Sequence, residues 1–311
     1  MQATHIDTDS RLLQLLNNAN ALLAVGEVEG GMTLLVDGLQ DLRSSLPPEA
    51  WRSACGDCLA HPIRNTVHQD PLTRRAFHKP RGYAGDAVTI DYYYGHWDGL
   101  LDDVTPLGMR LLSFVSAHPA AQAVRYRRDY IARVLDAEAR RKPLRALSVA
   151  SGHVREAHHC QALRTGGVSE LVALDQDPES LALVASTFAG LPITPLRARI
   201  RDLLPGKLEL GSFDLVYSLG LYDYLERDTA RTLTERLASM LAADGLLVLA
   251  NFLPEMPASG YSESFTDWPL VLRTQAEMEA LTTNLDASRF VTHSERDPWS
   301  AVTYLTVRRR A

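Results

Sequence analysis

The acid Asp175 has the residue type and the position of a group that binds a ribose. A short apolar run over residues 144–149 leads into the small residues Ala150, Ser151 and Gly152. A second buried-strand pattern ends on Asp175, 23 residues after Gly152. A strand, a tight turn, a helix and a strand ending in an acid form the nucleotide-binding half of a doubly wound α/β sheet. We therefore predict that the backbone of the turn approaches a ligand and that Asp175 accepts hydrogen bonds from its ribose hydroxyls.

The glycine content of this turn argues against a dinucleotide ligand. Pyrophosphate binding uses a G-x-G-x-x-G pattern, in which backbone N–H groups and a helix N-terminus face the anion. Only Gly152 is present here, and the sequence contains no glycine-rich loop ending in Gly-Lys-Ser/Thr. An adenosine ligand without phosphate fits better, and S-adenosylmethionine (SAM) is the common one. Residues 197–203 are predicted to form a third strand, from which Asp202 would accept a hydrogen bond from the adenine amino group.

With predicted strands at 212–218 and 244–251, the order and spacing of five elements make residues 143–311 resemble the class I SAM-dependent methyltransferases. The resemblance implies a Rossmann-like α/β sheet that binds SAM. The contacts that it implies are Ala150, Ser151, Gly152, Glu156, Asp175, Gln176, Asp202, Leu203 and Ser218.

The first motif departs from the pattern of that family. An acid usually stands two residues before the first motif glycine, where this chain has Ser148, and the first and third glycines are Ala150 and Val154 here. Glu156 is the candidate to supply the missing carboxylate. The alternative is that its charge only complements the dipole of the helix predicted to follow.

A second signature lies at residues 75–95, with the sequence Arg-Ala-Phe-His-Lys-Pro-Arg-Gly-Tyr-Ala-Gly-Asp-Ala-Val-Thr-Ile-Asp-Tyr-Tyr-Tyr-Gly. Together with Ser-Leu-Gly-Leu-Tyr-Asp-Tyr-Leu at 218–225, it resembles a bacterial subgroup that includes 3-hydroxy fatty acid methyl ester biosynthesis proteins. It also resembles azetidine-2-carboxylate synthases, which cyclise SAM itself. The combined match covers about residues 80–311 and implies an N-terminal helical cap over a SAM site.

The turn at 81–86 is predicted to act as a lid, because its two glycines permit special dihedral angles. Tyr83 would pack on the ligand, and Arg81 or Lys79 would meet its carboxylate. Tyr93, in a run of three tyrosines, would bring an aromatic face to the sulfonium cation. The alternative is a rigid loop that an Arg81–Asp86 pair closes.

Ser218 and Tyr222 follow the fourth predicted strand, where this fold places ligands. They join Tyr83 and Tyr93 as candidate catalytic residues, against the alternative that the 222–224 segment only packs in the core. If the substrate is a hydroxyl or an amine, the candidate proton acceptors are His153, His78 and Asp223.

The chain divides into a predicted helical cap or lid domain at 1–142 and a SAM-binding domain at 143–311. Apolar residues at helical spacing, bounded by Gly and Pro, predict the helices of the cap. Residues 254–267 are predicted to be a polar loop, and 290–295 with 301–308 a closing antiparallel pair. The remaining predicted helices span 12–25, 31–46, 48–59, 106–117, 119–141, 227–241 and 274–285.

Composition limits the partners of this 311-residue chain, which is 46% hydrophobic and carries a formal net charge of −6. The acidic balance makes nucleic acid an unsuitable partner. The sequence shows neither a signal-peptide pattern nor an apolar run long enough for a membrane span. Three cysteines indicate a cytoplasmic protein rather than a disulfide framework. Cys55 and Cys58 have zinc-like spacing but no second pair, so we expect no metal site.

Three functions fit these residues. The first is methyl transfer from SAM to a small acceptor of specialised metabolism, a carboxylate, hydroxyl or amine, which the enzyme must align with the S–CH3 bond. The second is cyclisation of SAM, in which its α-amino group attacks its own γ-carbon and 5′-methylthioadenosine is released. The third is a non-catalytic SAM-binding scaffold, which the degenerate first motif suggests.

Overall fold

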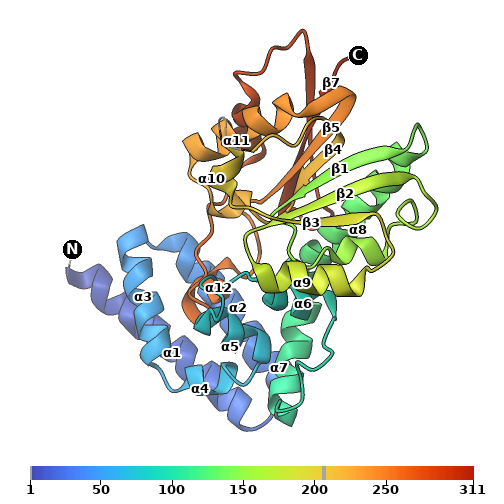
Figure 1. Cartoon of the computed structure of the whole chain (residues 1–311). Coiled ribbons are helices and arrows are strands. Elements are labelled where there is room, and N and C mark those ends of the chain that lie inside the picture. Colours follow the sequence, from blue (N-terminus) through green and yellow to red (C-terminus); the bar gives the residue numbers. More distant parts are fainter. Residues whose placement is uncertain (1, 205–207) are drawn as a thin grey trace. The chain divides into compact units, whose positions relative to one another are not determined.

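Figure 1 shows the computed structural model of the protein, which describes residues 2–204 and 208–311, with side chains from Ser10 onward. The chain forms two compact units. The first consists of Met1–Gln122 and Pro257–Pro269, and the second of Ala123–Met256 and Leu270–Ala311. The sequence predicted a division at residue 142. In the structure most of the helix α8 (Pro119–Ala139) belongs to the second unit, and a segment from late in the chain belongs to the first.

The first unit is helical. Its long helices pack through leucines and other apolar residues at helical spacing, and prolines begin several of them. The core of this unit includes Tyr261 and Phe265 from the late segment. Its helices are α1 (Gln2–Ala24), α2 (Val28–Ser45), α3 (Pro48–Ala60), α4 (Ile63–Val67), α5 (Pro71–His78), α6 (Ala87–Tyr94), α7 (Pro106–Ala117) and α12 (Ser259–Phe265).

The second unit holds, within the described residues, a seven-stranded sheet in the order β3-β2-β1-β4-β5-β7-β6. The strands β1 to β5 are parallel, and β7 runs antiparallel to both of its neighbours, β5 and β6. The order of the strands reverses between β1 and β4. Open α/β sheets bind their ligands at such a point, beyond the carboxyl ends of the strands. The strands are β1 (Leu144–Val149), β2 (Val168–Asp175), β3 (Ile193–Arg197), β4 (Phe213–Ser218), β5 (Leu241–Phe252), β6 (Phe290–Arg296) and β7 (Val302–Arg309).

Two apolar clusters cover the two faces of this sheet. One joins β1 and β2 to α8 through Ile131 and Leu135, and the other joins β4 and β5 to α11 (Arg227–Ser239) through Leu233 and Leu237. The Rossmann-like α/β fold expected from the sequence is therefore confirmed (Figure 1). The other elements of the unit are η1 (Arg155–His158), α9 (Pro178–Thr187), α10 (Ile200–Leu203), η2 (Tyr222–Tyr224), α13 (Gln275–Glu279) and η3 (Ala280–Thr282).

The structure corrects three predicted elements. The third strand lies at Ile193–Arg197, so the predicted strand over 197–203 is wrong, and Asp202 and Leu203 lie instead in α10. The segment after Gly152 forms only the short 3-10 helix η1. The predicted polar loop at 254–267 contains α12, because the side chains of Tyr261 and Phe265 are buried in the helical core.

Candidate functional site

The carboxylate of Asp175 fastens the turn after β1 to the end of β2. One oxygen accepts a hydrogen bond from the backbone N–H of Gly152 at 2.8 Å, and the other from the backbone N–H of Asp177 at 2.9 Å. Asp175 is buried, and the backbone N–H of Ser151 donates to the carbonyl of Leu174. Each carboxylate oxygen has two acceptor positions. The acid can therefore hold the turn in shape and still accept hydrogen bonds from a diol.

In the turn after β1, every second residue from Ala150 to Val154 has a left-handed backbone conformation. The φ angles are +55° at Ala150, +53° at Gly152 and +51° at Val154. Glycine is the residue that adopts such angles without strain, and a β-branched valine rarely does. Two of the motif glycines are thus missing from the sequence, yet the backbone keeps glycine-type conformations at both positions.

Glu156 points into the protein. Its carboxylate accepts a hydrogen bond of 2.6 Å from the hydroxyl of Tyr217 in β4. Burial raises the pKa of Glu156, and the Tyr217 hydrogen bond and the nearby guanidinium groups of Arg128 and Arg127 oppose that rise. Glu156 thus lies in η1 with its carboxylate bound to β4, and its role toward a ligand stays a prediction.

Of the candidate residues at and after the end of β4, Ser218 lies where the strands end and Tyr222 lies in the apolar core. The hydroxyl of Ser218 donates to the carbonyl of Val149 at 2.9 Å, which joins β4 to the end of β1. The hydroxyl of Tyr222 is 3.0 Å from that of Thr234 in α11, and the Tyr222 side chain is fully buried in the apolar cluster. Tyr222 thus occupies the core position that was the alternative for this segment.

Asp223 is a buried carboxyl near the carboxyl ends of β4 and β5. It accepts a hydrogen bond of 2.7 Å from the backbone N–H of Phe252 at the end of β5. Burial raises the pKa of Asp223 to about 6, against the lowering effects of Arg127, the Phe252 hydrogen bond and Arg273. At neutral pH the group is therefore ionised and able to accept a proton.

The other residues predicted to touch adenosine lie in varied places. Gln176 is exposed after β2, while Leu203 is fully buried in the apolar core. The carboxylate of Asp202 accepts from the backbone N–H of Arg199 at 2.9 Å and so caps its own short helix. Of these three, Gln176 has the surface that a ligand can reach most directly.

Arg81, Tyr83 and Tyr93 belong to the first unit, where all three are half-buried. The acid of their turn, Asp86, caps α6 and forms a bidentate pair with Arg75, with N···O distances of 3.1 and 2.8 Å. The turn is therefore anchored at its C-terminal end. The roles of Arg81, Tyr83 and Tyr93 toward a ligand stay predictions.

Arg127 is a buried charged residue, near the carboxyl ends of the strands, that the sequence analysis did not name. Arg127 lies on α8 with only 5% of its surface exposed, and its guanidinium carbon is 5.6 Å from the centre of the Phe252 ring. The available signal was its helical position, since Arg127 lies four residues from both Ala123 and Ile131, which are buried. An arginine in the apolar stripe of a helix is a buried charge that calls for a partner.

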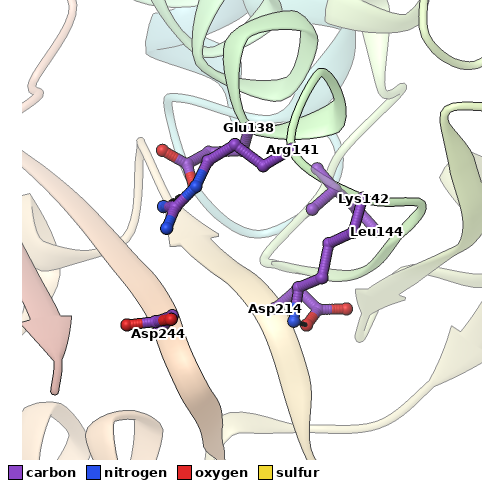
Figure 2. A pocket seen from close by; sticks show the side chains of 6 residues that line it. All are labelled: Glu138, Arg141, Lys142, Leu144, Asp214 and Asp244. Carbon is purple, nitrogen blue, oxygen red and sulfur yellow. Dashed lines mark hydrogen bonds and ion pairs between the residues drawn. The ribbon is translucent and has the colours of Figure 1, made fainter. Parts of the chain in front are cut away.

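A polar cavity of about 220 Å³ lies at the amino end of the sheet (Figure 2). Four of its charged groups form two ion pairs within the lining, since Lys142 lies 2.6 Å from Asp214 and Arg141 lies 3.3 Å from Glu138. It lies at the end of the sheet opposite Asp175, because Leu144 and Asp214 lie at the starts of β1 and β4. The lining residues are Glu138, Arg141, Lys142, Leu144, Asp214 and Asp244.

The cysteine pair of the first unit has the chemistry of packing residues. Burial raises the pKa of the Cys58 thiol to about 12 and also raises that of Cys55, whose sulfur lies 3.6 Å from the hydroxyl of Ser264. Across the residues that the structure describes, no group of three or more His, Cys, Asp and Glu side chains is placed to hold a metal ion. Nor is any helix of that part of the chain long and apolar enough to cross a membrane.

Comparisons with known proteins bear on the fold. No family model matches the sequence, and no curated protein matches it. Among solved structures, a possible exported protein from Bordetella parapertussis is similar at 21% identity, with a TM-score of 0.61 over 86% of this chain and 100% of that one. This likeness shows a shared fold.

Two further solved structures are similar at a lower level. One is a SAM-dependent methyltransferase from Mesorhizobium loti, at 19% identity and TM-score 0.43, covering 58% of this chain and 96% of that one. The other is magnesium protoporphyrin IX methyltransferase from Synechocystis with bound S-adenosylhomocysteine, at 13% identity and TM-score 0.48, covering 71% and 98%.

Proposed function

We propose that this protein is a SAM-dependent methyltransferase-fold enzyme that acts on a small molecule. The observation that carries the proposal is the Asp175 carboxylate at the end of β2, joined to a left-handed turn at the end of β1. A carboxylate that can accept from a diol, next to a half-buried backbone turn where the strands of a Rossmann-like sheet end, supports SAM binding there.

A buried polar atom in the turn after β1 supports a ligand at this position. Among the described residues, the hydroxyl oxygen of Ser151 is buried and has no hydrogen-bond partner. A ligand that approaches the turn would supply a partner for this oxygen and so remove the cost of burying it unpaired. Asp175 would hold the ribose, and the backbone of 150–152 would lie against the ligand.

SAM, when bound, supplies a methyl group on a cationic sulfur. The residues of the protein would then bind the two reactants, align them and exclude water. If the acceptor is a carboxylate, no base is required. If it is a hydroxyl or an amine, the carboxylate of Asp223, with a pKa of about 6, is a proton acceptor in the second unit.

The test is to incubate the purified protein with SAM and to identify products by mass spectrometry. S-adenosylhomocysteine that forms only when a candidate acceptor is added supports methyl transfer. 5′-Methylthioadenosine above the no-enzyme control, with no acceptor present, would instead support the cyclisation of SAM. Binding of SAM by calorimetry without either product would identify a SAM-binding scaffold, and absence of binding would refute the proposal.

A further inference from the structure

Arg127 carries a buried charge without a hydrogen-bond partner for its Nε atom. Only 5% of the residue is exposed, and Nε finds no partner among the described residues. A buried guanidinium is costly unless its donors are satisfied, and it is the side chain best shaped to bind a carboxylate. The position of Arg127 therefore indicates an anionic partner.

The guanidinium lies at the edge where the strands end. It is 5.6 Å from the ring centre of Phe252, the last residue of β5. Its Nη2 atom is 3.6 Å from the position that a Cβ atom would occupy on Gly220, two residues beyond β4. Because Gly220 has no side chain, the backbone after β4 leaves space beside the guanidinium.

A second unpartnered donor belongs to the same neighbourhood. Tyr304 is fully buried in β7, and its hydroxyl has no hydrogen-bond partner within the described part of the chain. The Tyr304 ring centre lies 6.3 Å from that of Tyr126, the residue before Arg127 on α8. The charge of Arg127 also opposes the rise that burial gives to the pKa of Tyr304. A phenol hydroxyl and a guanidinium in one neighbourhood offer two kinds of donor to one anion.

The two carboxylates whose pKa values the charge of Arg127 lowers are already engaged elsewhere, whereas Asp297, which raises the pKa of Tyr304, has an Oδ2 atom without a partner among the described residues. Glu156 accepts from the hydroxyl of Tyr217, and Asp223 accepts from the backbone N–H of Phe252. The charge of Arg127 lowers the pKa of both carboxyls. Neither carboxyl accepts a hydrogen bond from the Nε atom of Arg127.

We propose that Arg127, with the hydroxyl of Tyr304, forms a carboxylate-binding subsite at the carboxyl edge of the sheet. The inference rests on the proposed function, because two ligands of that reaction could bring the carboxylate. One is the amino-acid end of SAM, and the other is a carboxylic acid that serves as the acceptor. The sequence analysis predicted that Arg81 or Lys79 of the first unit binds the carboxylate of SAM.

The test measures binding by calorimetry in the wild type and in Arg127→Met, which removes the charge but keeps much of the length. The ligands are SAM, decarboxylated SAM and 5′-methylthioadenosine. If the carboxylate belongs to SAM, the substitution weakens SAM binding roughly 30-fold, as loss of a charge-assisted hydrogen bond predicts. The two ligands that lack a carboxylate should bind within two-fold of wild type, which also shows that the variant is folded.

A second arm identifies an acceptor carboxylate. Acetate is titrated into protein saturated with S-adenosylhomocysteine. If the subsite binds the amino-acid end of SAM, the carboxylate of S-adenosylhomocysteine fills it and acetate does not bind. If the subsite binds the acceptor, it stays open and acetate can bind. Acetate binding that Arg127→Met abolishes assigns the subsite to the acceptor. Arg127→Lys should restore part of the affinity in either arm, and Tyr304→Phe should weaken it less than Arg127→Met does.

Arg133→Gln is the matched control, because Arg133 is exposed on the same helix with its guanidinium over the Tyr126 ring. It should leave all affinities unchanged. If Arg127→Met alters neither SAM nor acetate binding, the subsite is refuted while the proposed function stands. If the wild type binds no adenosine ligand, the proposed function fails and the subsite fails with it.

Discussion

At the scale of single residues, acids and strained backbone define this site more clearly than glycines do. Asp175 could be found from the sequence because it ends a strongly apolar strand pattern. Arg127 could not, because a charged residue in a helix is usually exposed and only packing shows where it points. Nor does the sequence show which way the side chains of the 222–224 segment point. Tyr222, a candidate catalytic residue, packs against α11, whereas its neighbour Asp223 bonds to the end of β5.

The first prediction concerns Asp175→Ala. Loss of the ribose acceptors should weaken SAM binding by about 2–3 kcal/mol, or roughly 30- to 150-fold. Because the carboxylate also accepts two backbone N–H groups, the variant should lose about 1–2 kcal/mol of unfolding free energy. Calorimetry and urea denaturation measure the two effects. Asp175→Asn, which keeps one acceptor oxygen, should fall between the two proteins. Unchanged SAM affinity in folded Asp175→Ala protein would contradict the ribose assignment.

At the scale of elements, periodicity predicted β1, β2, β4, β5 and the closing hairpin, because long apolar patterns are decided by burial. It failed where local patterns compete. The alternating residues 197–203 resemble a strand but form α10, whereas β3 is short and contains Pro195. The polar composition of 257–269 concealed two buried aromatic residues at helical spacing, Tyr261 and Phe265.

The turn after β1 supports a second prediction. Ala150 has a φ of +55°, so Ala150→Gly should raise the unfolding free energy by about 0.5–1 kcal/mol through relief of strain. The same chemical change at Ala137, exposed within α8, should lower it by about 0.5–1 kcal/mol. Thermal or urea unfolding of both variants gives the comparison. Equal losses at the two positions would show that the turn is not strained.

A third prediction concerns the loop between α5 and α6. If it closes over SAM, Tyr83→Ala should reduce turnover at saturating SAM about ten-fold, equal to about 1.4 kcal/mol in the barrier. Hydrogen exchange should show residues 80–95 gaining protection when SAM is added. Tyr83→Phe retains the ring and separates packing from the hydroxyl. Normal turnover in Tyr83→Ala, with exchange that SAM does not change, would make the turn a structural element held by Arg75 and Asp86.

At the scale of the whole molecule, each unit contains a buried carboxyl with a raised pKa. In the first unit, burial raises the pKa of Asp70 to about 6, although Asp70 accepts hydrogen bonds from Thr73 and Leu72. In the second, burial has the same effect on Asp223. Both folded-state pKa values lie above the ordinary aspartate value near 3.9. The folded protein therefore holds these protons more tightly than the unfolded chain does.

A fourth prediction follows for stability against pH. The contribution of each group is fully present below about pH 4 and is lost as the pH rises to about 6. Relative to Asp223→Asn, the wild type should lose up to about 3 kcal/mol of unfolding free energy between pH 4 and pH 7. Urea denaturation across that range measures the difference. Asp286→Asn is the control of opposite sign, because hydrogen bonds from Ser288 lower the pKa of the exposed Asp286.

The placement of residues 257–269 has a consequence for synthesis on the ribosome. The helical core needs Tyr261 and Phe265, Gly260 packs tightly against the backbone of Leu39, and Glu263 bonds to Arg43 and Trp51. The helices up to Gln122 are translated long before this segment. At about 5–20 residues per second, the 134 residues in between take roughly 7–27 seconds. A nascent chain would therefore expose an incomplete apolar surface for that time, which makes it a client for chaperones that bind during translation.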